Sequence, residues 1–126
     1  MDPDPFEFDE SDWPILRLSF REKMSDDDFA RYLETYRGYI ARGGRYGLIM
    51  DVSTHFGMLP MTQARMQMDF LAREAPRLRE VCWGVAFVLP GPIHRGALRA
   101  MLKMQPMPMD FTVVGTHEDA RAWLAG

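Results

Sequence analysis

Polar and ionisable side chains follow three apolar runs of the sequence, at the point where each run ends. The set comprises Asp51, Ser53, Thr54 and His55 after YGLIM, His94 and Arg95 after VAFVL, and His117 after FTVV. It contains every histidine of the chain. Imidazole, carboxylate, hydroxyl and guanidinium groups suit three kinds of site, which are a metal site, an anion site and a catalytic centre.

A metal site would have to bring the three histidines together. Three imidazoles form a plausible zinc set. However, a dense arrangement such as His-Glu-x-x-His is missing, and each histidine belongs to a different segment. Polar residues also fall after strands by default, because loops lie at the surface. We therefore predict no metal and no cofactor.

An anion site is suggested by the segment PGPIHRG, residues 90–96. If this segment opens a helix, its free amide hydrogens and the guanidinium of Arg95 can hold a phosphate or a carboxylate. The glycine spacing matches neither a P-loop nor a dinucleotide fingerprint. The alternative is that Pro90, Gly91 and Pro92 only turn the chain, and both interpretations stay open.

A catalytic centre would need an activated nucleophile beside a base. Ser53 lacks the Gly-x-Ser-x-Gly elbow that lifts a serine clear of a sheet. Cys82 begins its apolar run, so it falls at the opposite end from the histidines. Asp51 can act as a base, but a carboxylate after a strand more often caps the next element. We predict that the protein is not an enzyme, and a small enzyme using Asp51, His55 and His94 remains the third hypothesis.

The elements that position these residues alternate along the chain. Period-two alternation predicts a β-hairpin in 6–23, and helical spacing predicts helices near 25–42, 61–79, 92–104 and 116–126. Apolar runs without alternation predict buried strands near 45–52, 80–90 and 109–115. The expected fold is a single α/β domain, residues 1–126, with a mostly parallel central sheet flanked by helices on both faces. Residues 1–5 are expected to form a flexible acidic terminus.

In such sheets, ligands bind beyond the carboxyl ends of the parallel strands. We call this edge the C-terminal rim. The polar set, Asp51, Ser53, Thr54, His55, His94, Arg95 and His117, is predicted to lie on it and to contact a ligand or a partner.

Composition excludes several classes of protein. The chain has 126 residues, 47% of them hydrophobic, and a net charge of −3. Six acidic residues fall in the first 12, and the bases form no cluster, so nucleic-acid binding is not expected. No apolar run approaches the roughly 20 residues that cross a bilayer, and no export signal is recognised. With Cys82 as the only cysteine, these features predict a cytoplasmic protein.

Methionine is unusually frequent, with 11 residues. Helical spacing places Met61 and Met68, with Ala64 and Leu71, on the inward face of the second helix. About half of the methionines are expected in the core, and the rest suit an adaptable contact surface. The interface is predicted at Met58, Met66, Met107 and Met109.

The layout resembles the STAS-like superfamily, and within it the small stand-alone bacterial proteins called SpoIIAA-like. The resemblance rests on the hairpin FEF and ILRLSF, on MSDDDFARYLETY, on RYGLIMDVS, and on CWGVAFVLP and THEDARAWL. It implies a regulatory module that binds another protein or a second copy of itself. It also extends to the lipid-binding CRAL-TRIO domains, which overlap in shape.

One segment departs from this family pattern. Anti-sigma-factor antagonists carry a phosphorylated serine in an Asp-Ser-Ser/Thr-Gly-like turn, which falls by position in DVSTHFG. Here Val52 separates Asp51 from Ser53 and Thr54, and the glycine is displaced to Gly57, so the turn is not reproduced. The predicted function is a non-catalytic regulatory or protein-interaction module. The alternative is a module that binds a small anionic or apolar ligand, or a lipid, with a site at the C-terminal rim.

Overall fold

The computed structural model describes residues 4–53, 59–105 and 107–126 of the chain. The elements follow the predicted alternation: β1 Phe6–Asp9, β2 Ile15–Phe20, α1 Asp26–Ala41, β3 Tyr46–Asp51, α2 Met61–Val81, β4 Cys82–Val88, α3 Pro92–Lys103, β5 Phe111–Val114 and α4 His117–Ala125. No helix among the described residues is long and apolar enough to cross a membrane.

The five strands form one sheet in the order β1-β2-β3-β4-β5. β1 runs antiparallel to β2, and β2 to β5 run parallel to one another. The predicted α/β architecture, with an opening hairpin and a mostly parallel sheet, is therefore confirmed. In this sheet all four parallel strands end at the same edge, so the C-terminal rim is continuous from β2 to β5.

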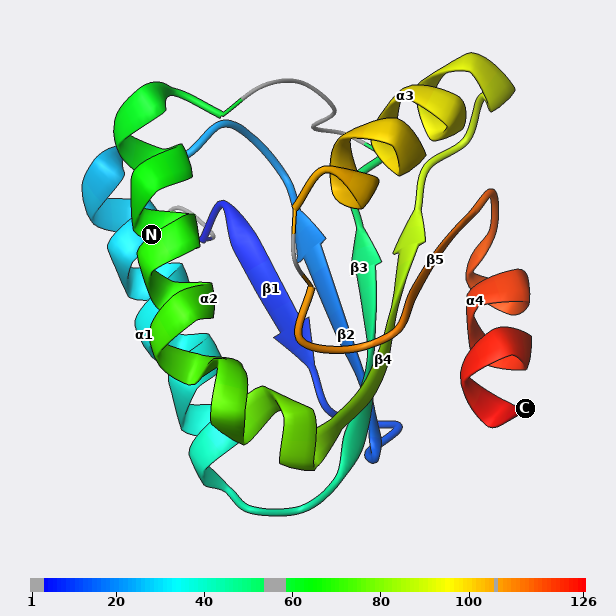
Figure 1. Ribbon diagram of the computed structural model, residues 1–126, viewed down its shortest axis with the longest axis horizontal. Helices are drawn as coiled ribbons and strands as arrows, with labels where there is room; N and C mark the ends of the chain where they lie inside the picture. The colour runs from blue at the N-terminus through cyan, green and yellow to red at the C-terminus, as the bar shows by residue number, and fades with distance from the viewer. Residues whose placement is uncertain (1–3, 54–58, 106) are drawn as a thin grey trace.

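Helices cover both faces of the sheet, as predicted, but unequally. α1, α2 and α3 lie on one face, and α4 lies on the other (Figure 1). The reason is that consecutive strands are neighbours, so every right-handed crossover places its helix on the same side. The large core lies under the three helices. A smaller core lies under α4, where Ile49, Ala86 and Val88 meet Ala120 and Leu124.

Local signals explain where α1 begins and ends. The hydroxyl of Ser25 accepts a hydrogen bond from the amide of Asp28 at 3.1 Å, so Ser25 is the N-cap of the helix. The buried face of the helix consists of Phe29, Tyr32, Leu33, Tyr36 and Ile40. After the helix, Gly43 takes a φ of 90°, a value that favours glycine.

The inward face predicted for α2 is wrong. Met61 is 77% exposed and Met68 is 62% exposed. The buried residues of this helix are Gln63, Phe70, Leu78 and Val81. Gln63 is buried because its amide nitrogen donates to the main-chain oxygen of Met24 at 2.8 Å and to Asp26 at 3.1 Å.

Pro76 lies inside the same helix, where a proline removes a hydrogen bond and tends to kink or end the helix. The helix continues through Pro76 to Val81 and changes direction towards its C-terminal end (Figure 1).

Two glycines allow α4 to approach the sheet closely. A Cβ on Gly84 would lie 2.8 Å from the ring of Trp123, and one on Gly47 would lie 2.9 Å from Leu124. The indole of Trp83 donates to the main-chain oxygen of Leu124 at 3.0 Å and fastens the end of the helix. The C-terminal end of α4 thus packs tightly on the first residues of β3 and β4, whereas its first residue, His117, lies beside Asp51 at the other end of β3.

Candidate functional site

Asp51 is the last residue of β3, on the face that α4 covers. Alternation along the strand explains this orientation, because Ile49 and Asp51 share one face whereas Leu48 and Met50 share the other. In the neighbouring strand, Ser19 lies opposite Asp51. The Asp51 side chain is 20% exposed, so the carboxylate is only partly open to solvent.

Both oxygens of Asp51 are hydrogen-bonded. The amide of Ser53 donates to Oδ1 at 2.9 Å, and the hydroxyl of Ser53 donates to the same oxygen. Nε2 of His117 lies 2.7 Å from Oδ2. The structure therefore brings together three residues of the predicted set: Asp51 at the end of β3, Ser53 in the segment after it, and His117 at the start of α4.

These contacts set the charge of Asp51. Burial raises the pKa of the carboxyl group, but the two hydrogen bonds from Ser53 and the contact with His117 outweigh it, so the pKa lies below its ordinary value. Asp51 is therefore a carboxylate at neutral pH, and it holds the first residue of α4 against the end of β3.

The geometry of His117 limits what this group can do. Although 43% of its side chain is exposed, Nδ1 is buried and has no hydrogen-bond partner among the described residues. The other ring nitrogen, Nε2, is occupied by Asp51. A general base needs a nitrogen within reach of the substrate proton, so this arrangement suits a structural tie better than proton transfer.

Two further residues of the predicted set lie in the first turn of α3. Arg95 donates to the main-chain oxygen of Leu89 at 3.2 Å, and its guanidinium lies beside Gly115, close to the start of α4. His94 lies near Gly91, which has a φ of 95° and precedes the helix without a side-chain cap. Arg95 thus spans the ends of β4 and β5.

Three predicted residues, Thr54, His55 and Met58, lie outside the residues that the structure describes. Within the described ranges, no group of three or more His, Cys, Asp or Glu side chains could hold a metal ion. The small-enzyme hypothesis depends in part on His55, so it stays the third hypothesis.

Cys82, the other predicted nucleophile, is 3% exposed at the start of β4. Its thiol donates to the main-chain oxygen of Gly84 at 3.5 Å. Burial raises the pKa of Cys82 to about 11, so almost none of it is thiolate at neutral pH.

We therefore expect the native thiol to react with Ellman's reagent at pH 8 only as fast as the protein opens, and at least 100-fold more slowly than in denaturant. A stopped-flow comparison of native and guanidinium-unfolded protein measures both rates. Equal rates would mean that Cys82 is accessible and that its burial is wrong.

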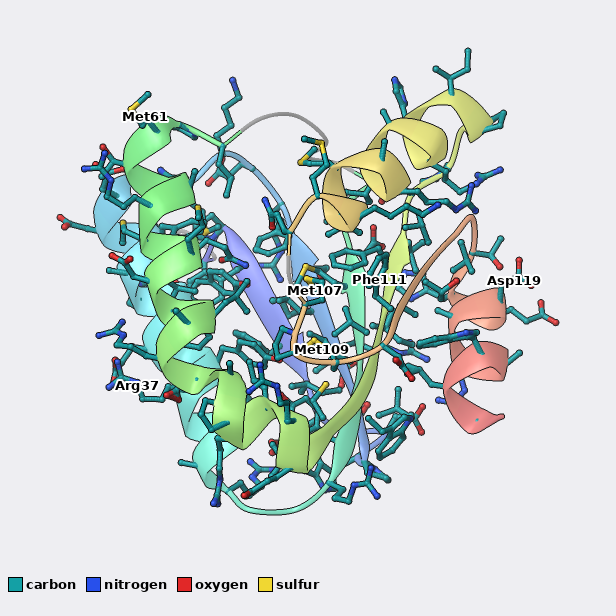
Figure 2. All side chains as sticks on the ribbon, viewed as in Figure 1. Arg37, Met61, Met107, Met109, Phe111 and Asp119 are labelled. Atoms are coloured by element: carbon teal, nitrogen blue, oxygen red, sulfur yellow. The ribbon has the colours of Figure 1, made fainter. Side chains whose placement is uncertain are left out.

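Three of the four predicted interface methionines can be placed. Met66, Met107 and Met109 are all half-buried and pack against the core. Figure 2 shows Met107 and Met109 on the connection from α3 to β5, which crosses in front of the sheet. Both line an apolar cavity of about 100 Å³ that also touches Phe70, Phe87 and Leu102.

A larger hollow of about 570 Å³ lies between α1 and α2. Its apolar floor includes Leu33, Met66 and Phe70, and its walls carry Glu34, Arg37, Asp69 and Arg73. Acidic and basic residues are balanced around it, so its charge favours no particular ligand.

The most exposed apolar surface of α3 was missed in the sequence. Ile93 is 85% exposed, Met104, at the end of the helix, is 86% exposed, and Met101 is 38% exposed. Gly96, Ala97 and Ala100 are exposed between them. Leu98 and Leu102 form the buried face of the helix. The exposed apolar residues therefore form a second stripe, which consists of Ile93, Gly96, Ala97, Ala100, Met101 and Met104. The signal in the sequence that could have revealed this stripe is the helical spacing of the apolar residues at positions 93, 97, 100 and 104. We call these six residues the outer stripe of α3.

Comparison with known proteins supports the fold. No family model and no curated protein matches the chain. Among solved structures, it is similar to an uncharacterized protein from the DUF3478 family with a SpoIIAA-like fold, from Shewanella loihica PV-4. The TM-score is 0.73 at 16% sequence identity, over 94% of this chain and 91% of that one. The chain therefore has a SpoIIAA-like α/β fold, and the predicted resemblance is confirmed at the level of the fold.

The contacts of Asp51 predict how stability depends on pH. Because the folded-state pKa is lowered, the contribution of Asp51 is present above its ordinary pKa of 3.8 and is lost as pH falls through the lower folded-state value. We expect Asp51→Asn to lower the free energy of unfolding by about 1 kcal/mol at pH 7. We also expect it to flatten the loss of stability below pH 4.

Urea unfolding between pH 2 and pH 7 measures both effects. Asp69→Asn, on the exposed side of α2, is the control and should change stability by less than about 0.5 kcal/mol at pH 7. An unchanged pH dependence in Asp51→Asn would show that the ties to Ser53 and His117 do not contribute.

Proposed function

We propose that the protein is a non-catalytic regulatory or protein-interaction module that acts in the cytoplasm and binds its partner through the outer stripe of α3. The observation that carries this proposal is the exposure of Ile93 and Met104, at 85% and 86%, at the two ends of one helix. Single exposed apolar residues are ordinary on protein surfaces. A continuous apolar helix face on the outside of a domain is typical of an interaction site.

The spacing of the stripe also supports helix docking. Ile93, Ala97, Ala100 and Met104 are separated by four, three and four residues, which is the spacing of a seam between packed helices. The seam points away from the buried Leu98 and Leu102. α3 stands apart from α1 and α2 at the upper right of Figure 1, so a partner can approach it.

The chemistry of the rim supports a role without catalysis. Asp51 is occupied by Ser53 and His117, and the free nitrogen of His117 is buried. Cys82 is buried and protonated. None of these groups is presented to a substrate as a nucleophile or as a base.

A photocrosslinking experiment tests the proposal. A benzophenone amino acid at Ile93 of the full-length chain, expressed in its own host, is expected to capture a protein partner. The matched control carries the same group at Ala122, on the exposed side of α4, and should capture little. Ala100→Glu should abolish the crosslink from position 93. Equal capture at both positions, or none at position 93, would contradict the proposal.

A second candidate function is the binding of a small apolar ligand or lipid. It is favoured by the apolar cavity beside Met107 and Met109, which reaches Met50 and Phe87 near the carboxyl ends of β3 and β4. A cavity of about 100 Å³ accommodates only a small hydrocarbon group or part of a chain. Native mass spectrometry of the purified protein tests it: a co-purified ligand that is lost in Met107→Lys would support it, and an empty protein would not.

A further inference from the structure

We propose that the apolar cavity beside Met107 and Met109 binds a compact, neutral molecule whose polar atom accepts a hydrogen bond from the hydroxyl of Tyr32. This inference rests on the second candidate function, and it names the chemical class of the ligand and the residue that recognises it. Three features support it: the hydroxyl of Tyr32, the lack of charge among the described residues that line the cavity, and the size of the cavity.

Tyr32 lies on the buried face of α1, is 3% exposed and lines the cavity. The hydroxyls of Tyr36 and Tyr46 bond to each other at 2.8 Å, whereas the hydroxyl of Tyr32 forms no hydrogen bond with any residue that the structure describes. Burial alone raises the pKa of the Tyr32 phenol, whereas the bond with Tyr46 contributes to the raised pKa of Tyr36. A buried donor without an acceptor is unfavourable, so this hydroxyl calls for a partner.

The walls of the cavity favour an organic ligand over water as that partner. They are built mainly from apolar side chains, among them Met50, Phe70 and Phe87. The two amides in the lining belong to Gln67, which is half-buried, and to Gln105, which is exposed. A water molecule needs about two to four polar partners, and apolar cavities stay dry. A molecule with an apolar body and one oxygen would fill the space and accept the hydrogen bond at the same time.

The charge of the lining selects a neutral ligand. None of the described residues that line the cavity is charged. A carboxylate or a phosphate would lose its hydration there without a guanidinium or an ammonium to replace it, which is strongly unfavourable. The head groups of fatty acids and phospholipids therefore fit poorly. The oxygen of a ketone, an ester or an ether fits, because it accepts a hydrogen bond and carries no charge.

The size of the cavity sets the size of the ligand. The volume is about 100 Å³, and a cavity of about 150 Å³ is known to hold benzene. The apolar body is therefore one small ring or a short branched chain. Met50, Met107 and Met109 line the space together with aromatic rings, and their flexible, polarizable side chains can adapt to the shape of such a body.

The test uses full-length protein labelled with ¹³C in its methionine methyl groups and three compounds of similar size: cyclopentanone, methylenecyclopentane and cyclobutanecarboxylate. Cyclopentanone is expected to bind with a Kd in the millimolar range and to shift the methyl resonances of Met50, Met107 and Met109. Met61 and Met68 are 77% and 62% exposed and away from the cavity, so their resonances should stay in place. Cyclobutanecarboxylate is expected to bind at least tenfold more weakly than cyclopentanone.

Two variants test the role of the hydroxyl. Tyr32→Phe removes only that group and should weaken cyclopentanone about fivefold, because one hydrogen bond is lost. It should leave the Kd of methylenecyclopentane unchanged, since this compound has a CH₂ group in place of the oxygen. Tyr39→Phe makes the same change at a half-buried tyrosine that does not line the cavity, and it should leave both Kd values unchanged.

The free protein gives a measurement that involves no ligand. Because the hydroxyl of Tyr32 has no partner to lose, Tyr32→Phe should leave the urea midpoint unchanged or raise it. Tyr36→Phe removes the hydrogen bond to Tyr46 and should lower the midpoint. If Tyr32→Phe lowered the midpoint as much as Tyr36→Phe, the hydroxyl would already have a partner in the free protein, and the proposal would be overturned.

Each contrary outcome is distinct. If Tyr32→Phe weakened the ketone and the hydrocarbon equally, or weakened neither, the role of the hydroxyl would be overturned. Binding of cyclobutanecarboxylate as tightly as cyclopentanone would overturn the neutral class of ligand. In both cases the second candidate function stands, provided that the shifts map to Met50, Met107 and Met109. If neither neutral compound shifts these methionines, this inference and the second candidate function both fail. The crosslink at Ile93 tests the interaction module independently.

Discussion

Replacing Phe70 by alanine is expected to lower the free energy of unfolding by about 3–5 kcal/mol. Phe70 is 1% exposed, and its ring stacks on that of Tyr36 at a centroid distance of 5.8 Å. Its side chain lines both the hollow between α1 and α2 and the apolar cavity beside Met107 and Met109. Removing the ring would join two empty spaces, which neighbouring side chains cannot refill without loss of contact.

The matched control is Met68→Ala, two residues earlier in the same helix. Met68 is 62% exposed, so its truncation should change stability by less than about 0.5 kcal/mol. Urea unfolding of both variants measures the difference. The pair distinguishes two orientations of α2, because the pattern of the sequence favoured Met68 as the inward residue. A large loss for Met68→Ala with a small one for Phe70→Ala would show that the helix is rotated relative to the structure.

Adding a single methyl group at Gly47 is expected to destabilise the protein by about 1–3 kcal/mol. The new Cβ would lie 2.9 Å from Leu124 and 3.0 Å from the ring of Trp83. Leu124 is 5% exposed, and the indole of Trp83 is held by the main-chain oxygen of that same residue. The added methyl group must therefore displace the buried end of Leu124 and press on the ring of Trp83, which is held by its hydrogen bond.

Gly38→Ala provides the opposite expectation. Gly38 lies inside α1, and a Cβ there would meet nothing within 4 Å. This change should stabilise the protein by about 0.5–1 kcal/mol, because glycine is the poorer helix former. Thermal unfolding of both variants gives the comparison. If Gly47→Ala were as stable as the wild type, the close packing of α4 against β3 would be wrong.

The sequence was most informative where a signal is local. The hydroxyl of Ser25, the acidic residues after it and the buried Leu16 and Leu18 act within a few residues of the chain. Their patterns were sufficient to predict the order of the elements and the parallel sheet. The hydroxyl of Thr116 caps the last helix in the same local way, by accepting a hydrogen bond from the amide of Asp119 at 3.1 Å.

The errors arise where distant segments decide the outcome. α2 could not be oriented from its own residues, since Gln63 is buried only because Met24 and Asp26 accept its amide hydrogens. Asp51 and His117 were predicted to share a rim, but a bond between residues 66 positions apart depends on how closely α4 packs on the sheet.

The outer stripe of α3 was overlooked for a different reason. Methionine and alanine are equally ordinary in a core and on a surface, so their pattern does not distinguish the two faces of a helix. Only the burial of Leu98 and Leu102 shows which face points inward.

The two edges of the sheet have a consequence for behaviour at high concentration. β1 and β5 are the outermost strands, and each has only four residues. β1 also carries Glu7 and Asp9 on the face of the sheet where α4 lies, and α4 packs mainly on β3, β4 and β5. A strand from a neighbouring molecule would find few free backbone groups and nearby negative charge. Concentrated solutions should therefore resist fibril growth, even though the interior strands are rich in residues that favour amyloid.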